Sequence, residues 1–254
     1  MDYVIGEEYT LPSLGKAYNE LGLSVPSTVR LRSMTTAEEM KRLNHSDRPY
    51  KILADIIDAC LVDKLPISSY DMCYADFEFL LHKLRVVTYG SIYPLRVRCP
   101  QCFTEVDEKI DLDSIPVKQY NQDQISGLME FDLPVTKHHI KIRMQTPRMM
   151  DNIKAEVKDF KRRSPSFNGD PAFLFTLKSI ITEIDYNRPD PLNFEDFIIN
   201  LPMRDSQKIN VMSNRLEDSI GLQLQLDITC DECGLDYKSS FRFTSEFFRP
   251  SIID

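Results

Sequence analysis

Two Cys-x-x-Cys motifs, Cys99–Cys102 and Cys230–Cys233, constrain the fold of this 254-residue chain more than any other feature. Within each motif, two thiolates separated by two residues on a tight turn can face the same cation. Two such motifs supply the four sulfur ligands of a tetrahedral zinc site, each about 2.3 Å from the ion. The sequence therefore predicts that segments 131 residues apart (230 − 99 = 131) meet at one metal ion.

The metal that we expect at Cys99, Cys102, Cys230 and Cys233 is zinc, because ligation by cysteine alone favours soft or borderline ions over magnesium or calcium. Four protein ligands leave no position for water or substrate, so the predicted role is structural. The alternatives are a redox dithiol, an iron–sulfur cluster and two unrelated motifs. A redox dithiol usually opens a helix, where the pKa of a thiol is lowered, and no further motif indicates electron transfer.

The residues around the cysteines alternate between apolar and polar, as in a strand with one buried face. The apolar positions that flank the second motif are Leu222, Leu224, Leu226, Ile228, Leu235, Tyr237, Phe241 and Phe243. Strands on both sides of a tight turn predict a β-ribbon that carries the cysteines at its tip.

An internal repeat is suggested by two similar segments, Val29–Thr35 and Ile140–Thr146, which lie 111 residues apart (140 − 29 = 111). Each has the pattern of a strand followed by a helix start. In the first, Thr35 and Glu38 form a predicted capping box. In the second, Thr146 is the predicted N-cap, and Pro147 stands at the first helical position, where its missing N–H costs nothing.

Further matches follow in the same order along the chain. Pro66–Asp71 resembles Pro191–Asp196 at an offset of 125 (191 − 66 = 125), and each is expected to begin a short helix. The glycine and cysteine positions then match at an offset of 131. Offsets that rise from 111 through 125 to 131 indicate a duplication with small insertions.

The predicted fold class is therefore α+β, with two similar halves. Each half has a β-hairpin, several helices and a β-ribbon with a Cys-x-x-Cys knuckle, and a shared zinc site joins the two. The expected boundaries are residues 1–118 and 119–254. Apolar side chains at helical spacing predict core-facing helices, with these stripes: Ile52, Leu53, Ile56, Ile57 and Cys60; Phe77, Leu80, Leu81 and Leu84; Phe173, Leu174, Leu177, Ile180, Ile181 and Ile184; Ile209, Met212, Leu216 and Ile220.

Composition and charge exclude several classes of function. A net charge of −8 argues against broad nucleic-acid binding, which depends on Lys and Arg neutralising phosphates. No stretch approaches the roughly 18 apolar residues of a membrane span. The acidic residues 1–8 lack the apolar core of a signal peptide, so we expect an intracellular protein. Phosphate-binding loops and hydrolase motifs do not occur, which favours a protein that is not an enzyme.

Several segments together resemble the baseplate hub assembly proteins of contractile-tailed, T4-type bacteriophages. The resemblance covers nearly the whole chain and includes both cysteine pairs. Its other elements are Leu11–Tyr18, Arg30–Thr35 followed by Glu38 and Glu39, Leu84-Arg85 with Thr88-Tyr89-Gly90, and Phe247–Pro250.

This resemblance implies a non-enzymatic scaffold or chaperone, or a minor component, of the phage baseplate hub. Its partners would be other hub and tail proteins, and it would act in the host cytoplasm during assembly or in the tail baseplate of the virion. Leu11–Tyr18 and Phe247–Pro250 are then candidate contact surfaces, because exposed aromatic residues and Arg often anchor interfaces. The alternative for Phe247 and Phe248 is that they cap the core of the second half. The alternative function is a zinc-ribbon transcription accessory factor that binds RNA polymerase or nucleic acid.

Overall fold

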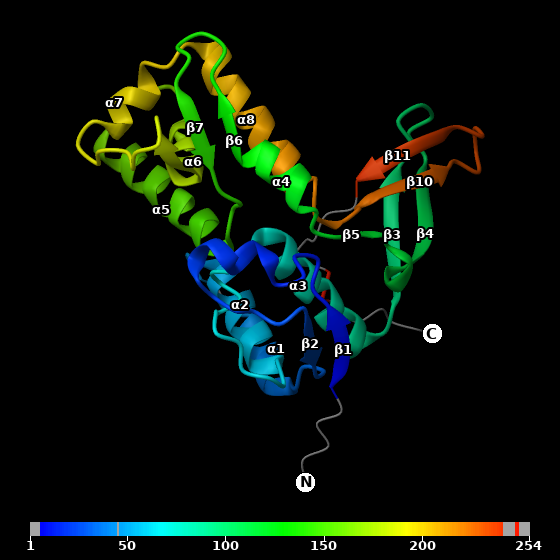
Figure 1. Cartoon of the computed structure of the whole chain (residues 1–254). Helices are drawn as coiled ribbons and strands as arrows, with labels where there is room; N and C mark the ends of the chain where they lie inside the picture. Colours follow the sequence, from blue (N-terminus) through cyan, green and yellow to red (C-terminus); the bar gives the residue numbers. More distant parts are fainter. Residues whose placement is uncertain (1–5, 45, 241–246, 249–254) are drawn as a thin grey trace.

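The computed structural model describes residues 6–44, 46–240 and 247–248. Within these residues, helices and small antiparallel sheets form two lobes, and two β-ribbons stand beside them (Figure 1). The predicted α+β class is confirmed. None of the helices in the described ranges has the length and apolar character needed to cross a membrane.

The first lobe begins with an antiparallel hairpin in which Glu7 pairs with Leu31 and Thr10 with Thr28. Helices then build the lobe, and α3 leads into the first ribbon. The elements in chain order are β1 (Glu7–Thr10), η1 (Lys16–Leu21), β2 (Thr28–Leu31), α1 (Thr36–Arg42), α2 (Pro49–Cys60), α3 (Tyr74–Tyr89), β3 (Ile92–Arg98), β4 (Glu105–Asp111), η2 (Leu112–Ser114) and β5 (Val117–Lys118).

The second lobe contains a three-stranded antiparallel sheet in the order β6-β7-β8, with helices packed around it. Its elements are α4 (Gln122–Met129), β6 (Glu130–Asp132), β7 (His139–Ile142), α5 (Pro147–Arg163), α6 (Ala172–Ile180), β8 (Ile181–Ile184), α7 (Phe194–Ile199) and α8 (Met203–Glu217). The chain then returns through β9 (Gly221–Leu222), which pairs with β5, and forms the second ribbon from β10 (Gln225–Thr229) and β11 (Asp236–Ser240).

The helix starts that the sequence predicted are present at three of the four matched positions. Helix α7 begins at Phe194 directly after Asn193, without a hydrogen bond from the Asn193 side chain. Thr35 and Glu38 form a complete capping box before α1. Thr146 accepts a hydrogen bond from the backbone of Met149 before α5, and Pro147 is the first helical residue. These caps satisfy amide groups that have no partner within the helix.

Each lobe contains an equivalent backbone hydrogen bond, which joins the end of the second hairpin strand to the end of the second helix that follows it. The N–H of Arg32, just after β2, donates to the carbonyl of Cys60 at 3.0 Å. The N–H of Arg143, just after β7, donates to the carbonyl of Ile180, also at 3.0 Å. In both lobes the chain after the second helix therefore returns along the hairpin.

A buried aspartate near the start of the long helix fixes the hairpin loop in each lobe. In α3, Asp76 Oδ1 accepts from the backbone N–H of Ser13 at 2.9 Å. In α8, Asp205 Oδ1 accepts from the N–H of Val135 at 2.8 Å. Each loop opens with a buried leucine before a proline, Leu11-Pro12 and Leu133-Pro134. Both aspartates are the third residue of their helix, a similarity that sequence inspection missed.

Three hydrophobic clusters hold the described residues together. The first surrounds α2 and α3, and the second lies between α6, α8 and the β6-β7-β8 sheet. The third is a small core between the two ribbons, next to the cysteines. The first cluster also takes in Ile220, Leu222, Phe247 and Phe248 from the C-terminal part of the chain.

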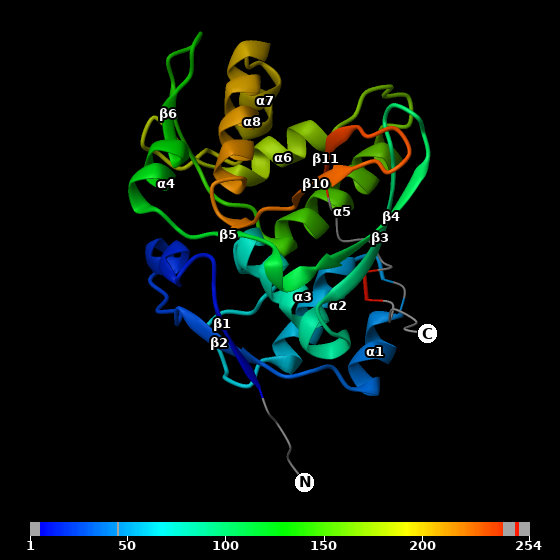
Figure 2. The same ribbon diagram turned by 90° about the vertical axis from the view of Figure 1, so that its right-hand side faces the viewer.

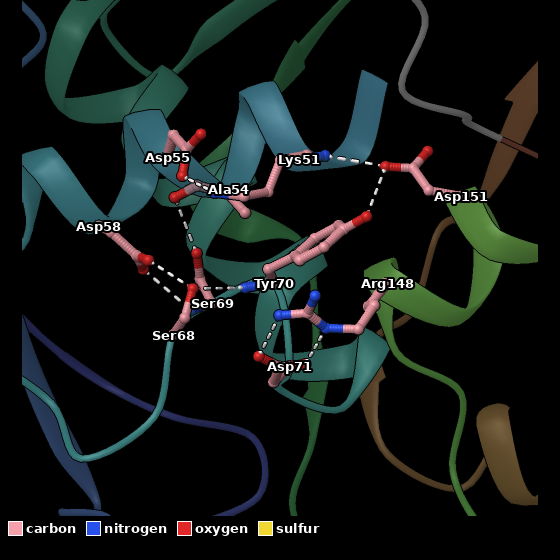
Figure 3. A network of polar contacts seen from close by, with 10 residues as sticks. All are labelled: Lys51, Ala54, Asp55, Asp58, Ser68, Ser69, Tyr70, Asp71, Arg148 and Asp151. Atoms are coloured by element: carbon pink, nitrogen blue, oxygen red, sulfur yellow. Dashed lines mark hydrogen bonds and ion pairs between the residues drawn. The ribbon is translucent and has the colours of Figure 1, made fainter. Parts of the chain in front are cut away.

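Helix α5 of the second lobe docks onto the first lobe through polar contacts (Figure 3). Asp151 is buried and accepts from the backbone N–H of Lys51 at 3.0 Å, in the first turn of α2, and from the hydroxyl of Tyr70 at 3.1 Å. It thus satisfies an amide at the start of α2 from a different helix. Arg148 forms a two-fold ion pair with Asp71, whose oxygens lie 2.5 and 2.8 Å away.

Some predictions about local structure were wrong. Residues 68–71 form a turn, and the next helix, α3, begins only at Tyr74. Asp58 of α2 explains this, because it accepts from the Ser68 hydroxyl and the Ser69 N–H and so fixes the turn. Phe173 was expected in the core but is 41% exposed.

The two expected contact surfaces were also wrong, because their apolar residues lie in the core. Leu11 and Tyr18 are buried in the first lobe. Phe247 and Phe248 are buried there too, and the Phe247 ring lies 5.4 Å from that of Tyr93. Arg249 and Pro250, with Phe241 and Phe243, lie outside the described residues.

Candidate metal centre

The four cysteines lie at the tips of the two ribbons, on turns that share one backbone geometry. In the first turn, Cys99 donates its N–H to Thr104 and accepts from the N–H of Phe103, at 2.9 and 3.1 Å. In the second turn, Cys230 makes the equivalent bonds with Leu235 and Gly234, at 2.9 and 2.8 Å. These bonds curl each turn so that both of its sulfur atoms point to the same side.

The curl places the residue after the second cysteine in the left-handed region of backbone space. Gly234 has φ 70° and Phe103 has φ 61°. Glycine adopts this conformation without penalty, whereas any residue with a Cβ pays a steric cost.

Packing of the ribbons face to face brings the four sulfur atoms together. The Sγ atoms of Cys99 and Cys233 are 3.7 Å apart, and those of Cys102 and Cys230 are 3.6 Å apart. All four ligand atoms lie within 4.8 Å of one another. A tetrahedral ion with bonds of about 2.3 Å has sulfur–sulfur edges of about 3.8 Å, so the observed spacing fits such an ion.

The same distances exclude disulfide bonds, whose sulfur atoms are about 2.05 Å apart. All four cysteines are free thiols, and each close pair joins one ribbon to the other. The predicted convergence of Cys99, Cys102, Cys230 and Cys233 is therefore confirmed.

The cysteine cluster is buried on one side and open on the other. Cys99 and Cys230 are fully buried against Val106 and Ile228, in the small core between the ribbons. Cys233 is exposed. A metal ion at this position would touch protein on its inner side and lie near solvent on its outer side.

Comparison with known proteins identifies one family whose sequence model matches the chain. A sequence model of the T4 bacteriophage base plate protein family matches residues 6–249. This chain belongs to that family. No curated protein and no solved structure matches the chain. The resemblance to T4-type baseplate proteins that the sequence motifs indicated is thus confirmed at the level of the family.

The thiols of this base plate protein differ in their tendency to ionise. Hydrogen bonding by the hydroxyl and the backbone of Thr104 lowers the pKa of Cys102 to about 6. The backbone of Leu235 acts in the same direction on Cys233, but desolvation and the three other cysteines raise the pKa of Cys233 to about 12. Four adjacent thiolates repel one another, so full deprotonation requires a cation to balance them.

Sequence reasoning found all four cysteines of the base plate protein and missed the left-handed Phe103. A signal for it was present, because the second motif continues with Gly234 and the first with Phe103 at the same offset of 131 (234 − 103 = 131). The adjacent His138 and His139 have different side-chain partners. His138 contacts Asp185, and His139 contacts Asp132.

Proposed function

We propose that this base plate protein is a non-enzymatic factor in hub assembly that acts through protein–protein contacts. It serves as a scaffold or chaperone for hub and tail proteins, or as a minor hub component. The observation that carries the proposal is the family match over residues 6–249. Assembly takes place in the host cytoplasm, and the product is the tail baseplate.

We further propose one structural zinc ion bound by Cys99, Cys102, Cys230 and Cys233. Sulfur spacing, the matched turns and the donor set support it. Cysteine-only ligation is typical of structural zinc, and such a site contributes on the order of 10 kcal/mol to folding in small peptide systems. In this protein the ion holds the two ribbons together, since the core between them is small.

The two halves, residues 1–118 and 119–254, arise in this proposal from an internal duplication. Its support is the shared order of hairpin, helix pair, long helix and ribbon, with the paired hydrogen bonds of Arg32 and Arg143. The buried aspartates Asp76 and Asp205 add an offset of 129 (205 − 76 = 129), between the 125 and 131 of the sequence motifs.

The test is cross-linked purification of the tagged, full-length chain from infected cells, followed by mass spectrometry. Hub and tail proteins that are absent from an untagged infection are the expected result. Cross-links to RNA polymerase subunits would instead favour a zinc-ribbon transcription factor and overturn the proposal. A phage that lacks this protein should accumulate incomplete base plates, and a plasmid copy should restore them.

A further inference from the structure

The two cysteine turns differ at one position that their shared geometry makes equivalent. The second turn has glycine at its left-handed position, and the first has Phe103 with φ 61°. A Cβ in this region approaches the neighbouring carbonyl, so Phe103 carries a steric cost that Gly234 avoids. A residue that costs stability where glycine fits is a residue to examine for function.

Core packing of the Phe103 side chain does not offset this steric cost. It is 61% exposed, and the hydrophobic cluster between the ribbons does not include it. Exposed phenyl rings gain little from folding, because most of their apolar surface stays in water. The ring is therefore displayed at the end of the ribbon.

Arg98 holds the ring in this position. Its guanidinium lies over the Phe103 ring at 5.2 Å from the centroid, and its Nε donates to the Phe103 carbonyl at 3.0 Å. The ring and the cation thus form one ordered unit at the tip of the β3–β4 ribbon. This ribbon stands beside the two lobes in Figure 1 and faces the viewer in Figure 2. Ordering before binding lowers the entropy cost of association.

The charge of Arg98 is not balanced by a carboxylate in the described part of the chain. Arg96, two residues earlier on the same face, has both Asp107 and Glu105 as ion-pair partners. Among the residues that the structure describes, Arg98 instead contacts a backbone carbonyl and the ring face. An external carboxylate would complete its fork-shaped set of donors.

We propose that Arg98 and Phe103 form the anchor by which this chain docks onto another base plate protein. The partner offers an apolar pocket for the ring and a carboxylate at the pocket rim for the guanidinium. Aromatic residues and Arg dominate the binding energy of protein interfaces. The occupant is a protein rather than a nucleic acid because the chain has a net charge of −8. This inference rests on the proposed function.

The test compares the wild-type chain with Phe103→Gly, which removes the ring and restores the residue that the second turn uses. Fold and bound zinc should be retained, with a melting temperature within a few degrees of wild type, since strain relief offsets the added chain entropy. The probe is base plate intermediates purified from cells infected with phage that lacks this protein. Binding to them should weaken at least 10-fold, as expected for an interface anchor.

Matched variants separate the anchor from other effects. Phe103→Tyr keeps the ring and should bind like wild type, and Arg98→Ala should weaken binding. Tyr186→Ser removes an aromatic residue that is 75% exposed on the second lobe, and it should leave binding unchanged.

The outcomes distinguish failure of the proposed anchor from failure of the proposed function on which it rests. Failure of the wild-type chain to bind any intermediate would overturn the proposed function. Wild-type binding that Phe103→Gly retains would overturn the anchor alone. Loss of zinc from Phe103→Gly would show that the ring shields the metal, and it would overturn the anchor. Binding of a single-stranded DNA 20-mer that depends on Phe103 would overturn the anchor as well.

Discussion

At the candidate metal centre, each cysteine offers a ligand atom and takes part in the contact between the ribbons. Cys99 and Cys230 are buried and come from different ribbons, so each is needed to hold its own turn against the other. Serine in either place offers a poorer, harder ligand and leaves three thiolates. Replacement of either cysteine should therefore change the stability of the ribbons as well as the metal content.

We predict that Cys99→Ser and Cys230→Ser each lower the zinc content from one ion per chain to well below one. Both should also abolish the cooperative unfolding of the ribbons. Elemental analysis and thermal melting measure the two effects. Cys60→Ala is the control, because it removes a buried thiol from the first lobe, far from the ligands, and should keep full zinc at a cost of about 1 kcal/mol. A wild-type protein that is equally stable without metal would contradict the zinc proposal.

Two acidic residues between α3 and α8 make stability depend on pH. Burial raises the pKa of Glu217 to about 7, above its ordinary value of 4.5, and it also raises that of Glu78 to about 7. The folded chain then keeps protons that the unfolded chain releases. Stability is therefore lost as the pH rises from about 4.5 to about 7, and the full penalty applies above that range.

We predict that Glu217→Gln stabilises the protein at pH 8 by on the order of 1 kcal/mol. The amide carries no charge, and its oxygen can still accept from the Gln145 N–H, 2.8 Å from Glu217 Oε1 in the wild type. The advantage should vanish at pH 4.5 and below, as measured by melting curves across this range. Glu156→Gln, at an exposed position of α5, is the control. An advantage that does not change with pH would exclude ionisation as its cause.

At the scale of elements, buried aspartates connect helices to hairpin loops. Asp76 accepts from the N–H and hydroxyl of Ser13 and from the hydroxyl of Tyr18, at 2.9, 2.5 and 2.6 Å. Asp205 accepts from two amides and one hydroxyl of Val135 and Thr136. Removal of Asp76 leaves polar groups of the buried Ser13 and Tyr18 without this partner, in a region that water does not reach. Val135 and Thr136 are exposed, so water can replace part of what Asp205 supplies.

We predict that Asp76→Ala destabilises the fold by about 3 kcal/mol or more and Asp205→Ala by about 2 kcal/mol, as measured by urea unfolding. Asp71→Ala breaks an ion pair with Arg148 in which both side chains are at least 40% exposed, and it should cost less than about 1 kcal/mol. If all three variants lose the same free energy of unfolding, the hydrogen bonds of Asp76 and Asp205 contribute no more to stability than the exposed ion pair of Asp71.

Element starts show where local sequence is sufficient. Thr146 and Pro147 begin α5 because the cap and the restricted proline act within one turn of the chain. Ser68 has a similar local pattern, yet Asp58 from α2 takes its hydroxyl and the next amide. Asp58 lies ten residues before Ser68, so a helix-cap pattern that spans four residues does not include it.

Considered whole, the molecule has two large cores that contain none of the four ligand cysteines, and a small third core that contains two of them. The lobes also dock through Asp151 and α2, independently of the metal centre. We therefore expect that loss of the proposed metal ion leaves the lobes folded.

We predict that a chelator at neutral pH opens the ribbons and leaves the lobes folded. Hydrogen exchange should accelerate in residues 92–111 and 225–240, while α2, α3 and α8 stay protected, because their stability comes from the two large cores. Re-addition of zinc should restore protection. Uniform acceleration over the whole chain would show instead that the ion holds the lobes as well.

The sequence by itself determined the features that depend on a few neighbouring residues. These are the two cysteine turns, the alternating ribbons that carry them, the caps of α1 and α5, and the family to which the motifs belong. Four converging sulfurs were also predictable, because a pair of thiolates needs two further ligands to complete a tetrahedron.

Only the tertiary structure decided which apolar residues are covered. Phe247 and Phe248 lie against the first lobe, although they follow the predicted end of that half by 129 and 130 residues (247 − 118 = 129; 248 − 118 = 130). Phe103 remains exposed although it is no less apolar. Hydrophobic burial has no direction and no sequence range, so the final packing of the chain selects its members.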